Sequence, residues 1–75
     1  MKDEIVAIAI EILKMSKEDV IKNSKSIPEI DGFYFWNPTR GGLSIIINSN
    51  CEKLGATSSV SFEKHLKAFI EGKRN

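Results

Sequence analysis

The sequence predicts one α+β domain over residues 1–75, with the element order helix, strand, strand, strand, helix. Three observations predict it: apolar residues recur at helical spacing near the N-terminus, two β-rich segments flank a turn-rich segment in the middle, and a second amphipathic segment lies near the end. We expect an antiparallel three-stranded meander with both helices packed on one face. A chain of 75 residues leaves no room for a second domain.

The first helix is predicted over Asp3–Met15, where apolar residues recur every three or four positions. They occupy more than half of the helix circumference, so a sheet together with a second helix or another subunit must cover them. We expect a homodimer, formed through this helix or through an exposed strand edge. The alternative is a monomer in which Val20 and Ile21 fold back over the helix.

A break in the first helix is predicted at Ser16, because a serine followed by two acids has the pattern of an N-cap. Either one helix runs to about Asn23, or a second short helix covers Lys17–Asn23. Ser24–Pro28 is predicted to be a loop, since the residue before a proline avoids helical geometry.

Three strands are predicted next. Phe33–Trp36 is a run of aromatic residues between turn signals, and Leu43–Asn48 contains three consecutive isoleucines. The six turn-type residues 37–42 join them as antiparallel neighbours. Leu54–Val60 alternates as a third strand.

The last helix is predicted over Phe62–Glu71, with Ser61 as its N-cap and Gly72 just past its end. Its apolar stripe consists of Phe62, Leu66, Phe69 and Ile70.

One sheet face is a candidate binding surface. Side chains alternate across a strand, so Tyr34 and Trp36 share the face opposite to Phe33 and Phe35. If the side chains of each strand that are all apolar face the helices, the other face of the sheet is open. Exposed Trp and Tyr side chains among small polar residues suit a protein interface. The alternative is that Trp36 packs at the sheet edge. We expect a partner to bind Tyr34, Trp36 and Ile46 on this face, together with Arg40 in the turn between the first two strands. The predicted open face carries Tyr34, Trp36, Ser44, Ile46, Asn48, Thr57 and Ser59.

Arg40 lies at the tip of the turn between the first two strands, where its planar guanidinium suits a carboxylate or phosphate. The glycines that follow it lack the spacing of a phosphate-binding loop. The two glycines are explained by a turn whose backbone needs positive φ at these positions.

The sequence predicts neither an enzyme nor a metal or cofactor site. His65 is the only histidine and borders the apolar stripe of the last helix, while Cys51 is the only cysteine and lies in a polar turn. No spacing pairs them as nucleophile and base. One His and one Cys cannot supply the three or four ligands of a zinc site.

The cysteine content suggests a cytoplasmic protein. A single cysteine permits no internal disulfide, as is usual in a reducing compartment.

No apolar run approaches the length of a transmembrane helix, so we expect no membrane contact. Eleven basic residues against ten acidic ones give a net charge of +1, which does not favour nucleic acid.

The segment Phe33–Gly72 reads as an aromatic strand ending in Trp36, a turn, an aliphatic strand, a polar turn and a Ser-rich strand that leads into a helix. In this order and in residue class it resembles the small immunity proteins of bacterial polymorphic toxin systems. The resemblance implies a non-enzymatic, stoichiometric binder of a protein partner.

The order helix, three antiparallel strands, helix also resembles the double-stranded-RNA-binding domain, whose second helix begins with a basic cluster that contacts phosphates. The equivalent stretch here is Ser61–Lys67, with an acid, Glu63, near its start. The alternative function is therefore binding of double-stranded nucleic acid, by Lys64, Lys67, Lys73 and Arg74.

Overall fold

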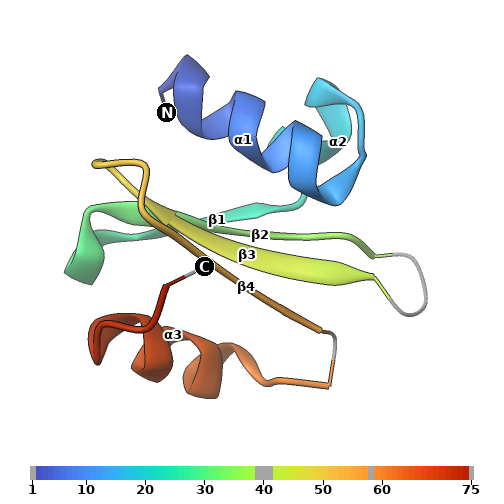
Figure 1. Cartoon of the computed structure of the whole chain (residues 1–75). Helices are drawn as coiled ribbons and strands as arrows, with labels where there is room; N and C mark the ends of the chain where they lie inside the picture. The colour runs from blue at the N-terminus through green and yellow to red at the C-terminus, as the bar shows by residue number, and fades with distance from the viewer. Residues whose placement is uncertain (1, 39–41, 58, 75) are drawn as a thin grey trace.

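The computed structural model describes residues 2–38, 42–57 and 59–74. They form one four-stranded antiparallel sheet in the order β1-β2-β3-β4. Helices α1 and α2 lie on one face of this sheet and helix α3 lies on the other (Figure 1). The elements are α1 (Asp3–Leu13), α2 (Lys17–Lys22), β1 (Ser24–Ile27), the 3-10 helix η1 (Pro28–Ile30), β2 (Gly32–Trp36), β3 (Leu43–Asn48), β4 (Lys53–Thr57) and α3 (Phe62–Ile70).

The α+β class and the antiparallel sheet are confirmed, but two finer predictions are wrong. The described part of the sheet has four strands instead of three, and the helices cover both faces instead of one. The reason lies in β3, where Ile45, Ile46 and Ile47 are each 0% exposed. Because successive side chains point to opposite faces, three consecutive isoleucines require cover on both sides of the sheet.

The predicted break at Ser16 is confirmed, and it is the two-helix alternative that occurs. Helix α1 ends at Leu13, and Lys14 takes a left-handed conformation with φ 55°. The Ser16 hydroxyl accepts a hydrogen bond from the Asp19 N–H at 3.2 Å and so caps α2. Within α2, Val20 is buried in the core but Ile21 is 48% exposed, so only Val20 folds back against α1.

The prediction of a loop over Ser24–Pro28 is wrong, because its first four residues form β1. This strand pairs with β2 from Ser24 opposite Phe35 to Ile27 opposite Gly32. Only Ile27 is buried, so the segment carries almost no hydrophobic signal. Backbone hydrogen bonds to β2 hold it in place, as in many polar edge strands.

The third predicted strand and the last helix are both present, but the predicted end of that strand at Val60 is wrong. Strand β4 ends at Thr57, and Val60 lies in the turn before α3, with its N–H donating to the Thr57 carbonyl at 3.1 Å. Ser61 caps α3 as predicted, accepting from the Lys64 N–H at 3.3 Å. The predicted apolar stripe of α3 is wrong at Ile70, which is 61% exposed.

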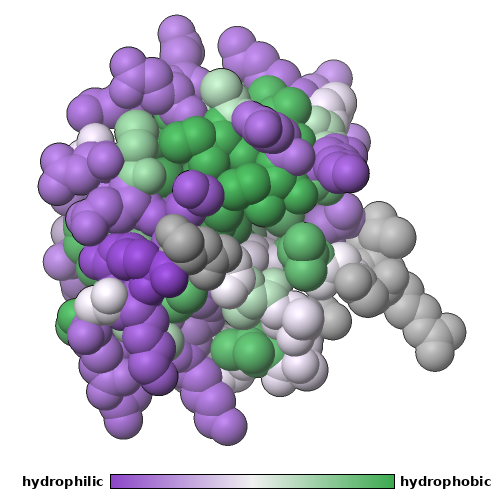
Figure 2. Space-filling model, viewed as in Figure 1, coloured by the Kyte–Doolittle hydropathy of each residue, from purple (hydrophilic) through white to green (hydrophobic). Residues whose placement is uncertain are grey.

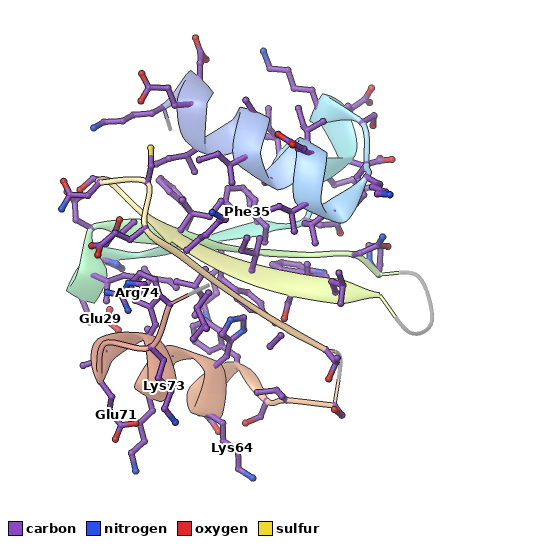
Figure 3. The ribbon with its side chains drawn as sticks, viewed as in Figure 1. Glu29, Phe35, Lys64, Glu71, Lys73 and Arg74 are labelled. Atoms are coloured by element: carbon purple, nitrogen blue, oxygen red, sulfur yellow. The ribbon has the colours of Figure 1, made fainter. Side chains whose placement is uncertain are left out.

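Two hydrophobic cores lie on opposite faces of the sheet. The larger core, beneath α1 and α2, includes Phe35, which points toward these helices in Figure 3. The smaller core, beneath α3, consists of Ile27, Ile46 and Phe69 with partly buried neighbours. Helix α3 has nine residues, which at 1.5 Å per residue is about 13 Å, so it covers only part of its face.

No helix among the described residues is long and apolar enough to span a membrane.

Candidate functional site

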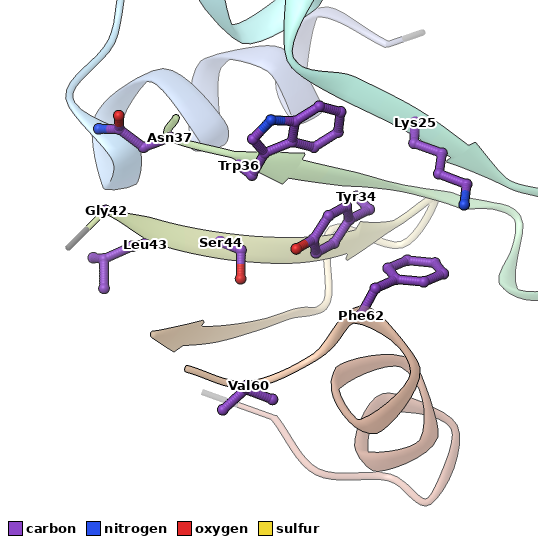
Figure 4. Close-up of a pocket in the computed structure, with 9 residues that line it drawn as sticks. All are labelled: Lys25, Tyr34, Trp36, Asn37, Gly42, Leu43, Ser44, Val60 and Phe62. Carbon is purple, nitrogen blue, oxygen red and sulfur yellow. The ribbon is translucent and has the colours of Figure 1, made fainter. Parts of the chain in front are cut away.

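The part of the sheet that α3 leaves uncovered forms a groove. Trp36, Ser44 and Ala56 lie opposite one another across β2, β3 and β4, just beyond the start of α3. The hollow has a volume of about 430 Å³ (Figure 4). We call it the aromatic groove; its lining residues are Lys25, Tyr34, Trp36, Asn37, Gly42, Leu43, Ser44, Val60 and Phe62.

Tyr34 is the centre of an aromatic cluster in this groove. Its ring stacks on Trp36, with centroids 5.5 Å apart, and meets Phe62 edge-on at 4.8 Å. Aromatic pairs at these separations stabilise one another beyond the area they bury. Tyr34 and Trp36 are therefore held in fixed positions although both remain partly exposed.

The polar groups at the groove include one cation and several hydrogen-bond donors. The Lys25 ammonium lies over the Phe62 ring, 4.4 Å from its centroid, which is a cation–π geometry. Among the described residues, neither the Tyr34 hydroxyl nor the Trp36 indole N–H has a hydrogen-bond partner. The groove thus combines apolar ring faces with donors for a hydrogen-bond acceptor.

His65 lies beneath the groove and is 1% exposed. Its Nε2 donates to the Leu54 carbonyl at 2.6 Å, and its Nδ1 is 3.4 Å from the Ser44 hydroxyl. Burial lowers the pKa of His65, and the hydrogen bond to Leu54 offsets only part of that effect. His65 is a packed, neutral side chain with partners at both ring nitrogens.

Cys51 lies on the opposite side of the sheet from His65. It packs against the core beneath α1, and its sulfur is 3.9 Å from a Glu4 carboxylate oxygen. The sheet therefore separates the only thiol from the only imidazole of the chain. No group of three or more His, Cys, Asp or Glu among residues 2–38, 42–57 and 59–74 could hold a metal ion.

The structure brings together two of the predicted binding residues, Tyr34 and Trp36. The prediction that Ile46 lies on an open face is wrong, because α3 covers it and it is 0% exposed. Ser44 and Asn48, placed on the same open face, are also buried. The placement of Thr57 on that face is wrong as well, because Thr57 pairs with Leu43 and lies on the face that α1 covers. Arg40 lies outside the described residues.

Several groove residues were not predicted. Lys25 falls in the segment predicted to be a loop, and only the pairing of β1 with β2 places it opposite Tyr34. The sequence predicts Phe62 only as part of the apolar stripe of α3, but as the first residue of that helix it forms a wall of the groove. A lysine at the centre of an edge strand is the sequence signal that could have indicated β1.

The basic residues of the alternative function do not form a uniform patch. The side chains of Lys64, Lys67 and Lys73 are exposed, but the acidic residues Glu63 and Glu71 lie among them. Figure 3 shows Glu71 beside Lys73. The Arg74 guanidinium donates to the Phe69 carbonyl at 2.6 Å and lies over the Phe69 ring at 3.7 Å. Arg74 is thus already engaged within the fold.

The chain matches no protein-family model, no curated protein and no solved structure.

Proposed function

We propose that this protein is a non-enzymatic binding module that holds a segment of another protein in the aromatic groove. The observation that carries the proposal is the stacked, partly exposed pair of Tyr34 and Trp36, with Phe62 as the facing wall. Rings that are already fixed lose little conformational entropy when a partner binds, and Trp and Tyr dominate the energetics of many interfaces.

Charge and donor content favour an acidic, apolar segment as the occupant. The Lys25 ammonium stands at one side of the groove, and the Tyr34 hydroxyl and the Trp36 indole supply two further donors. An aliphatic or aromatic side chain of the partner would lie on the rings, and a neighbouring carboxylate would meet Lys25. The immunity-like role and the cytoplasmic location expected from the sequence are parts of the same proposal.

Peptide binding in the aromatic groove can be tested by selecting binders from a displayed library of random peptides. We expect enrichment of sequences in which an apolar residue adjoins Asp or Glu. Because Trp36 is the only tryptophan, its fluorescence reports binding of a synthetic peptide directly. The contribution of Trp36 is measured by calorimetry, because the Trp36→Ala variant has no tryptophan fluorescence. This substitution should abolish binding of the peptide.

Two matched charge reversals separate the groove from general electrostatics. Lys25→Glu should weaken the binding of an acidic peptide at least tenfold, which corresponds to about 1.4 kcal/mol. Lys64→Glu changes the net charge equally, but on the exposed side of α3, and should leave binding unchanged. Circular dichroism establishes that each variant is folded. Equal effects of the two reversals, or a library without enrichment, would overturn the proposal.

The alternative function, binding of double-stranded nucleic acid, predicts a steep salt dependence. Affinity would fall by orders of magnitude between about 50 and 200 mM salt, because bound counterions are released from the phosphates. Absence of binding to duplex RNA and duplex DNA at the lower salt concentration removes this alternative.

A further inference from the structure

The two edge strands of the sheet differ in how they are protected. Strand β1 carries an exposed lysine, Lys25, in its interior and is followed directly by Pro28, and both features discourage pairing with another chain. The interior of β4, Leu54–Ala56, contains no charge and no proline. By this criterion β4 is the edge at which another strand can add.

The backbone groups on the outer side of β4 follow from the ladder. The Asn48 N–H donates to the Glu52 carbonyl at 3.0 Å, so Glu52 directs its carbonyl toward β3. Because direction alternates along an antiparallel strand, the N–H and C=O groups of Lys53, Gly55 and Thr57 point outward. No other strand in the described part of the chain lies beyond β4 to receive them.

An apolar surface of α1 lies beside this edge. At one end of the helix Glu4 contacts Cys51 in the turn before β4, and further along Ile12 lines a cavity of about 260 Å³ with Gly55 and Thr57. Ile8 lies between them on the same helical face and is only partly buried, like Ile12. Figure 2 shows hydrophobic side chains gathered between α1 and β4.

We propose that a second copy of this chain pairs with β4, strand to strand and antiparallel, around a twofold axis at Gly55. In this register Gly55 faces Gly55, and Lys53 of each copy faces Thr57 of the other. No like charges oppose each other across the axis. About four backbone hydrogen bonds can form, because the Thr57 carbonyl of each copy already accepts from the Val60 N–H at 3.1 Å. The outer side of β4 is therefore complementary to itself.

The same pairing would cover the wide apolar surface of α1. Glycine has no side chain, so the Gly55 pair leaves a trough on the α1 face of the joined sheet. The cavities beside Ile12 in the two copies would merge there, with Ile8 and Ile12 of both copies lining it. A closed dimer with a continuous sheet also removes the unprotected edge.

The test measures the molecular mass of the full chain in solution. Light scattering during gel filtration, at concentrations from about 10 to 500 μM, should move from 8.4 kDa toward twice that mass. Only 8.4 kDa at the highest concentration would overturn the proposal.

Two substitutions of one exposed residue test the register. Thr57→Glu places a carboxylate opposite Lys53 of the other copy and should tighten the dimer several-fold; Thr57→Lys places like charges there and should weaken it several-fold. Both remove the same hydrogen bond between the Thr57 and Ser59 hydroxyls, so their difference reports charge alone. Equal dissociation constants for the two variants would exclude this register. Peptide binding in the aromatic groove should persist in Thr57→Lys, which separates this proposal from the proposed function.

Discussion

The His65 side chain joins helix α3 to two strands at once. Its Nε2 donates to the carbonyl of Leu54 on β4 at 2.6 Å, and its Nδ1 is 3.4 Å from the hydroxyl of Ser44 on β3. A carbonyl can only accept, so Nε2 carries the proton and Nδ1 is an acceptor. The Ser44 hydroxyl can give its single proton to Nδ1 or to the Ala56 carbonyl, which is 3.5 Å away. The Tyr34 ring meets the imidazole edge-on at 5.8 Å, which links this arrangement to the aromatic groove.

The first prediction concerns pH. The pKa of buried His65 is lowered from 6.5, so the unfolded chain takes up a proton before the folded one as pH falls. Stability conferred by the neutral imidazole is therefore complete above about pH 6.5 and decreases as pH falls below that value. The urea midpoint should be lower at pH 5.5 than at pH 7.5.

His65→Gln is the control, because its amide can still donate to a carbonyl but does not titrate. The chain has no other histidine, so the variant should lose most of the pH dependence in this window. An unchanged slope in the variant would assign the effect to other groups.

Segments with a hydrophobic or capping signal of their own were predictable from the sequence, and segments held only by tertiary pairing were not. The caps at Ser16 and Ser61 and the strands with aromatic or aliphatic runs were predictable from local chemistry. Strand β1 was not, because three of its four residues are polar or charged and its stability comes from pairing with β2. Three consecutive isoleucines are typical of a strand buried on both faces, but the prediction from the sequence put α3 on the same face as the first helix and was wrong.

The candidate site was predictable only in part, for a related reason. Alternation alone places Tyr34 and Trp36 on one face, and this is confirmed by their stacking. Which part of that face stays open depends on the length and position of α3. The helix covers Ile46 and stops short of Trp36, a tertiary relationship that no local pattern encodes.

The second prediction concerns Gly32 on β2. A Cβ at this position would lie 2.5 Å from the Ile47 carbonyl oxygen and 2.8 Å from the Asn48 Cα, and backbone atoms cannot move aside cheaply. Gly32→Ala should therefore destabilise the fold by about 1–3 kcal/mol, as overpacking does elsewhere. Chemical denaturation measures the change.

Ser26→Ala, at an exposed position on β1, is a control and should change stability by less than about 0.5 kcal/mol. Equal stability of Gly32→Ala and the wild type would mean that β2 and β3 are further apart than the structure has them.

The third prediction concerns Arg74. Its guanidinium lies over the Phe69 ring, donates to the Phe69 carbonyl and is 3.6 Å from a Glu52 carboxylate oxygen. The ion pair is partly exposed and contributes little, but the cation–π contact with Phe69 and the hydrogen bond to its carbonyl help to end α3. Arg74→Ala should cost about 1 kcal/mol of stability.

Arg74→Lys keeps the charge but not the guanidinium that reaches both the Phe69 ring and the Phe69 carbonyl, so it should restore less than half of that loss. Full restoration by lysine would show that charge alone matters, and would return Arg74 to the set of cations available to a nucleic acid.

The fourth prediction concerns Ser61, which connects helix stability to the groove. Its hydroxyl accepts from the Lys64 N–H, and the next residue, Phe62, forms a wall of the aromatic groove. Ser61→Ala should cost about 1 kcal/mol by leaving that N–H without its cap, whereas Ser61→Asp should retain most of the stability, since a carboxylate both caps and favours the positive end of the helix. Urea denaturation gives the two stabilities.

Because Phe62 sits in the first turn, Ser61→Ala should also weaken peptide binding in the groove, and Ser61→Asp should affect it less. If Ser61→Ala lowered stability but left peptide affinity unchanged, Phe62 would not depend on this cap for its position.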